Sequence, residues 1–104
     1  MSTTKYVYVF VRKDIPLADQ IVQVGHACLE SGKMFKHPKG THLVLLEVGD
    51  KWELFDVIHH LHSCKIKSFI FWEPDDHMGY TAIATEPITT KQKILFKQFS
   101  LWSV

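Results

Sequence analysis

The sequence predicts an α/β protein, a three-layer α/β/α sandwich around a mixed four-stranded sheet with the element order β-α-β-α-β-β-α. Two observations carry this prediction. Apolar runs of strand length alternate with segments whose apolar residues recur at helical spacing. The last two strands are joined only by the polar stretch 74–79, which suits a hairpin. At 104 residues, 46% of them hydrophobic, residues 1–104 can form a single domain with its own core.

The first strand and the first helix have clear signals. KYVYVFVR at 5–12 is apolar on both alternating faces, which is typical of a central strand buried on both sides. Asp14 followed by Pro16 marks the start of a helix. This helix is expected to run to about Ser31 and to be closed by Gly32.

The middle of the chain continues the alternation. HLVLLEV at 42–48 is a second buried strand. Asp50 and Glu53 then form a capping box that opens a helix reaching about His62. KIKSFIFWE at 65–73 is the third strand.

The last part of the chain predicts a strand, a helix and a partner. YTAIATE at 80–86 is the fourth strand, and Thr89 with Gln92 caps a terminal helix. Large apolar residues extend around more than one face of this helix: Phe96, Phe99, Leu101 and Trp102. One face is enough to pack on the sheet, so the remainder predicts a homodimer.

Composition excludes several classes of protein. Twelve Lys and Arg against eleven Asp and Glu leave a formal charge of +1, so any contact with nucleic acid requires a local patch. Cys28 and Cys64 show no disulfide, redox or zinc spacing and suit reduced thiols. No signal peptide pattern or apolar stretch of membrane-spanning length occurs. We therefore expect a cytoplasmic protein that does not contact a membrane.

The first helix carries a polar pattern, QVGHACLESG at 23–32. At about 100° per residue, Gln23 and His26 fall opposite the side expected to face the core. The core side is expected to hold Leu17, Ile21, Val24 and Cys28. The polar stripe is either solvated helix surface or a site. Gly25 favours a site, because it would let a ligand approach the helix closely.

The segment VFVRKDIPLADQIVQVGHA at 9–27 resembles the opening of the second, archaeal and eukaryotic, type of peptidyl-tRNA hydrolase. In that family a hydrophobic strand ends in V-R-x-D-L and the following helix carries A-Q-x-x-H-A. The matching residues are Arg12, Asp14, Gln23, His26 and Ala27. TAIATEP at 81–87 is similar to the family's later strand end. The resemblance implies hydrolysis of the ester between a peptide and tRNA, with tRNA or peptidyl-tRNA as the partner.

That reaction needs a base that activates water and groups that stabilise the developing oxyanion. His26 is the candidate base, because imidazole titrates near neutral pH. Asp75 or Asp76, beyond the third strand, would orient it or act as the base instead. Lys13 is the nearest cation, and Gln23 would hold the substrate amide or the water.

Four more residues are candidates for substrate binding. Arg12 and Thr81 come from the segments that match the family. Lys33 and Lys36 belong to the densest basic stretch, which either contacts a tRNA backbone or keeps the adjoining loop solvated.

A second interpretation stays open. The family's helix opens with a Gly-Lys pair whose lysine is implicated in catalysis, and Ala18 and Asp19 stand at those positions. The alternative is therefore a catalytically inactive relative that binds RNA or a protein partner, or that forms oligomers. HHLHSC at 59–64 groups three histidines and a cysteine, but without zinc spacing. We expect neither a metal nor a cofactor.

Overall fold

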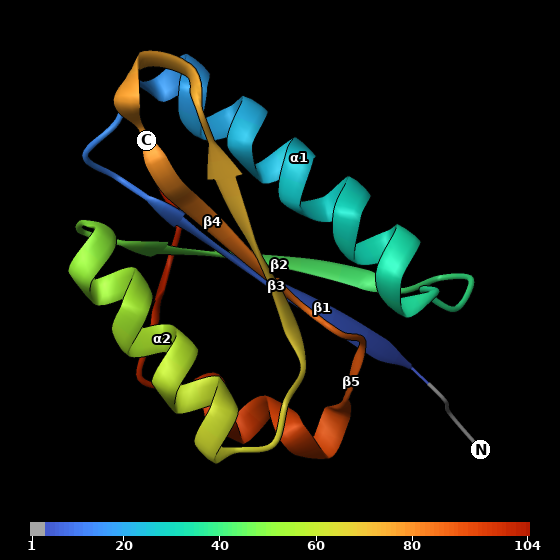
Figure 1. Ribbon diagram of the computed structural model, residues 1–104. Coiled ribbons are helices and arrows are strands. Elements are labelled where there is room, and N and C mark those ends of the chain that lie inside the picture. The colour runs from blue at the N-terminus through green and yellow to red at the C-terminus, as the bar shows by residue number, and fades with distance from the viewer. Residues whose placement is uncertain (1–3) are drawn as a thin grey trace.

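The computed structural model describes residues 4–104 as helices on both faces of one mixed sheet (Figure 1). The strands are β1 (Lys5–Arg12), β2 (His42–Val48), β3 (Ser68–Glu73), β4 (Gly79–Thr85), β5 (Ile88–Thr89) and β6 (Ser100–Leu101). Their order is β3-β4-β1-β2-β6, and β5 pairs with β1. The pair β1 and β2 is parallel, whereas β4 and β5 run antiparallel to β1. The predicted α/β class and the central position of 5–12 are confirmed.

The helices form the outer layers. α1 (Leu17–Phe35) covers one face of the sheet, and α2 (Lys51–Ser63) with the 3-10 helix η2 (Thr90–Phe96) covers the other (Figure 1). A second 3-10 helix, η1 (Asp75–His77), lies between β3 and β4. On the α2 side the sheet contributes large side chains such as Phe10 and Ile83. On the α1 side it contributes small ones, including Ala82 and Ala84, so α1 can approach the sheet closely.

The sheet has six strands instead of the predicted four. β5 and β6 contain two residues each, which is too short for any periodic pattern. β3 begins at Ser68 and not at 65, because Lys65 has a positive φ of 59° and belongs to a turn. The capping box of Thr89 and Gln92 is present, but the helix it starts is a 3-10 helix that ends at Phe96.

The terminal aromatic residues pack within the chain. Phe96 stacks on Tyr8 with ring centroids 3.9 Å apart, and Phe99 meets Phe10 edge to face at 5.0 Å. Trp102 is half-buried, whereas Leu101 is exposed. The three aromatic residues of this segment thus have partners within the chain, and the homodimer stays a prediction.

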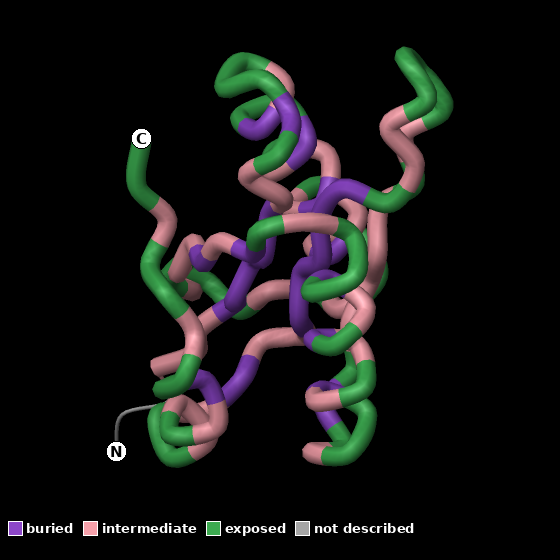
Figure 2. The backbone as a smooth tube through the Cα atoms, turned by 90° about the vertical axis from the view of Figure 1, so that its left-hand side faces the viewer, coloured by how far each residue is buried: buried purple, intermediate pink, exposed green. Residues whose placement is uncertain are grey.

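The predicted orientation of α1 is correct only in part, because Val24 and Cys28 pack against the core but Leu17 and Ile21 do not. Leu17 and Ile21, expected in the core, are 45% and 61% exposed. The residues of α1 that are buried are Gln20, Gln23, Ala27 and Ser31. The helix also continues past Gly32 to Phe35. Figure 2 shows how burial is distributed over the chain. Buried residues gather in the inner strands, and exposed residues lie along outer helix turns and loops.

Hydrogen bonds explain why α1 turns polar residues inward. Gln20 donates to Ile15 O at 2.8 Å and accepts from the Trp102 indole at 2.8 Å. Ser31 donates to Thr85 O at 2.9 Å. Because these buried groups have partners, their burial costs little, and the helix can present its small Ala27 side to the sheet. Within residues 4–104, no helix has the length and hydropathy needed to cross a bilayer.

Candidate functional site

Gln23, predicted to bind substrate, lies at the centre of a buried polar chain. Thr81 Oγ1 donates to Gln23 Oε1 at 2.6 Å, and Gln23 Nε2 donates to Glu73 Oε1 at 3.1 Å. Gln23 is 1% exposed and Thr81 is fully buried. Two residues predicted to bind substrate therefore meet, but their bonded atoms face each other inside the protein. Their hydrogen bonds link α1 to β4 and, through Gln23, to the Glu73 carboxylate.

A β-bulge aims Thr81 at α1. The register of β3 and β4 shifts between Phe71 and Trp72, which leaves Thr81 as the extra residue of β4. A bulge bends its strand and redirects a side chain. Thr81 accordingly reaches Gln23 on the α1 side of the sheet.

His26 lies one turn beyond Gln23 on α1. Its ring stacks on Phe71 with centroids 4.7 Å apart and an interplanar angle of 7°, and the residue is half-buried. The prediction that His26 faces away from the core is wrong, because it packs over β3. Phe71 and Glu73 alternate onto the same face of β3, the face that α1 covers.

Arg12 fixes the loop above this group. Its guanidinium donates to both carboxylate oxygens of Asp14 at 2.8 and 2.9 Å, and to Met78 O and Tyr80 O at 2.8 and 3.0 Å. The bond from Arg12 holds the pKa of the Asp14 carboxyl below its ordinary value. Asp14 is thus a partner of Arg12, while Pro16 precedes α1 without a side-chain cap. Arg12 ties β1 to the start of β4 and is a positioning residue.

Asp75 and Asp76 lie in η1, two or three positions beyond Glu73, and both are exposed. Asp76 and His77 have left-handed φ values of 53° and 56°, so the loop turns sharply here. Both carboxylates therefore follow Glu73 closely in the chain, on the loop whose Met78 carbonyl oxygen accepts from Arg12.

Lys13 does not join this group. Its Nζ donates to Ser103 O, lies 3.8 Å from Glu47 and sits 5.2 Å from the centre of the Trp102 ring. These partners belong to β2 and the chain end, on the opposite side of β1 from β4. Lys13 is therefore engaged elsewhere.

Lys33 and Lys36 are also outside the group. Lys33 is ten positions after Gln23 on α1, a separation of about 15 Å at the rise of an α-helix. Lys36 follows the helix, and both residues are exposed. Within residues 4–104, neither side chain forms a hydrogen bond, ion pair or ring contact with Gln23, His26 or Glu73, so neither belongs to this cluster.

Charge is segregated along the molecule. The carboxyl ends of β1 and β2 lie at the same end as the start of α1 and α2. Among the described residues, this end contains every Asp and Glu except Glu30 and Glu86, with Arg12, Lys13 and Lys51 as its cations. The remaining lysines lie toward the opposite end. The formal charge of +1 conceals an acidic end that surrounds the candidate site.

Sequence reasoning missed Glu73 and Phe71. The available signal was their alternation at the end of the third predicted strand, where ligands of α/β sheets commonly bind. Of the histidines at 59–64, His60 has its Nε2 2.7 Å from Leu95 O. Within residues 4–104, no three His, Cys, Asp or Glu side chains are placed to hold a metal ion.

Comparisons with known proteins bear on the fold. No family model matches the sequence, and no curated protein does so either. Among solved structures, the chain is similar to a protein of unknown function from Agrobacterium tumefaciens strain C58, with a TM-score of 0.72 and 10% sequence identity. The match covers 98% of this chain and 100% of that one. At this identity the likeness shows the fold alone.

Proposed function

We propose that the protein is an ester hydrolase of the peptidyl-tRNA hydrolase kind, which cleaves the ester between a peptide and tRNA. One observation supports this most. Gln23, in the segment that resembles the family's opening, bonds to Thr81, in the segment similar to its later strand end, although the two are 58 positions apart. Residues that share a family pattern at two distant places thus form one cluster with His26 beside it.

His26 acts as the general base in this proposal. Stacking on Phe71 fixes the plane of the imidazole, and the residue is half-buried, not fully buried. In this role His26 takes a proton from the water that attacks the ester. Gln23 holds Glu73 at the correct place, so Gln23 and Thr81 are positioning residues. Asp75 is next in line as a base.

Hydrolysis of peptidyl-tRNA tests the proposal. Release of peptide by the parent protein is expected, and His26→Ala should slow it by about a hundredfold or more. His59→Ala is the matched control, because His59 is an exposed histidine on α2, which packs on the other face of the sheet, and it should keep full activity. If the parent protein releases no peptide, the proposed hydrolase function is excluded. If the His26→Ala variant keeps full activity, His26 is excluded as the general base.

A non-hydrolytic binding domain is the second candidate. Asp19 stands where the family has its catalytic lysine, and the surrounding carboxylates repel phosphates. This candidate predicts that tRNA binds through the opposite, lysine-rich end without release of peptide. Lys33→Glu should then weaken tRNA binding. The hydrolase proposal instead predicts that peptide is released when the parent protein is incubated with peptidyl-tRNA. If the parent is inactive, gain of activity in Asp19→Lys would show that only the cation is missing.

A further inference from the structure

We infer that β3 is the interface of a symmetric homodimer, in which the β3 strands of two copies pair antiparallel about a twofold axis at Ile70. β3 is the edge of the sheet, and within residues 4–104 no strand pairs with its outer side. A strand edge with free N–H and C=O groups is a template for another strand. This inference is independent of the proposed hydrolase activity.

The backbone of β3 is suited to such pairing. Glu86 N donates to Lys67 O at 2.8 Å, so by the antiparallel alternation Phe69 and Phe71 face β4, and Ser68 and Ile70 direct their backbone groups outward. The stretch 68–72 contains neither proline nor a charged residue, which are the usual protections of an edge. The bulge adds its extra residue to β4 and leaves β3 regular.

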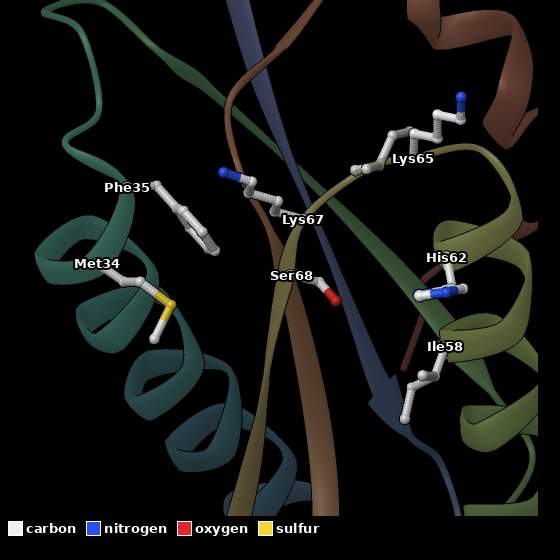
Figure 3. A pocket seen from close by; sticks show the side chains of 8 residues that line it. Met34, Phe35, Ile58, His62, Lys65, Lys67 and Ser68 are labelled. Atoms are coloured by element: carbon white, nitrogen blue, oxygen red, sulfur yellow. The ribbon is translucent and has the colours of Figure 1, made fainter.

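An exposed tryptophan and a cavity then meet across the axis. Pairing about Ile70 places Trp72 of each copy directly opposite Ser68 of the other, with both side chains on the α2 face. Trp72 is 56% exposed. Ser68 lines an open cavity of about 670 Å³ that also touches Ile58 and His62 of α2. Figure 3 shows these side chains beside the start of β3, with Met34 and Phe35 of α1 on its other side.

Charge fits the same arrangement. Lys65 and Lys67 precede β3, whereas Glu73, Asp75 and Asp76 end or follow it. Antiparallel pairing brings the basic start of one strand to the acidic end of the other, twice by symmetry. In the register centred on Ile70, Lys67 is opposite Glu73 and Lys65 is near Asp75 of the second copy. A parallel arrangement would place like charges together, so charge selects the antiparallel twofold dimer.

Sedimentation equilibrium of the full chain tests this inference. The parent is expected to dimerise reversibly. Trp72→Ala removes a central aromatic contact twice and should raise the dissociation constant by at least about a hundredfold. Trp52→Ala is the matched control, since Trp52 is also largely exposed but lies at the start of α2, and it should leave the dissociation constant unchanged. A parent that stays monomeric, or equal effects of the two variants, would overturn the inference.

Two further measurements locate the interface. Lys65→Glu should weaken the dimer by about fivefold, and adding Asp75→Lys should restore it, because each exposed pair contributes up to about 1 kcal/mol. Amide exchange should show concentration-dependent protection at Ile70. A dimer whose protection lies on α1 or β2 and leaves Ile70 unprotected would also overturn the inference.

Discussion

The hydrogen bond between Thr81 and Gln23 should behave as a coupled unit in folding. Both side chains are buried, and the bond is short at 2.6 Å. Thr81→Val keeps the side-chain shape but leaves the Gln23 amide oxygen without a donor, which should lower the free energy of unfolding by about 1–3 kcal/mol. Gln23→Met keeps most of the volume but leaves the Thr81 hydroxyl unpaired, with a similar expected loss.

The double variant separates a coupled pair from two independent contacts. It removes both partners and leaves neither buried group unpaired, so its loss should be close to that of one single variant. The resulting coupling energy is about 1–2 kcal/mol. Glu73 contributes little to this difference, because it is half-buried and water can replace the Gln23 donor.

Urea unfolding of the parent and the three variants measures this cycle, with unchanged m-values as the condition for comparing free energies. Losses that add within about 0.5 kcal/mol would refute the reasoning. They would mean that Gln23 and Thr81 do not share a bond in the folded protein, and that α1 is oriented differently.

Two other predictions test the orientation of α1 and the Arg12 contact. Ile21→Gln should change the free energy of unfolding by less than about 1 kcal/mol, because Ile21 is exposed; a loss of several kcal/mol in urea unfolding would return Ile21 to the core. Arg12 lowers the pKa of Asp14, so their pair stabilises the fold above the unfolded-state pKa of about 3.9 and this contribution is lost as pH falls through the lower folded-state pKa. Asp14→Asn should cost up to about 1 kcal/mol at neutral pH and make stability less dependent on pH below about 4, which unfolding over a pH series would contradict if the two curves stayed parallel.

Much of the architecture could be predicted because long elements leave periodic patterns. β1 has no polar face, and in the structure it is buried between two layers. The capping signals were local and specific, and Asp50 indeed accepts from the backbone N–H groups of Trp52 and Glu53. By contrast, β5 and β6 depend on where the chain end docks, which two residues cannot encode.

The membership of the candidate site was predictable only in part, and its orientation was not. Gln23 and Thr81, both selected from the sequence, form a hydrogen bond with each other. Glu73, which was not selected, is the other partner of Gln23. The error was to treat glutamine as an outward-facing residue. Whether a buried amide is tolerated depends on donors and acceptors far away in the sequence, here Thr81 and Glu73, and periodicity within one helix carries no information about them.

The orientation of α1 has a physical consequence for the proposed function. Turning Gln23 inward is what holds Glu73 and brings His26 over Phe71, and it also leaves apolar side chains such as Leu29 exposed at 73%. A helix optimised for burial alone would do the opposite. A buried polar network whose hydrogen bonds are all formed stabilises one packing geometry over similar alternatives. The arrangement therefore favours a defined His26 position over maximal burial. That is the trade expected where a helix serves a site, since stability is commonly sacrificed for function at such places.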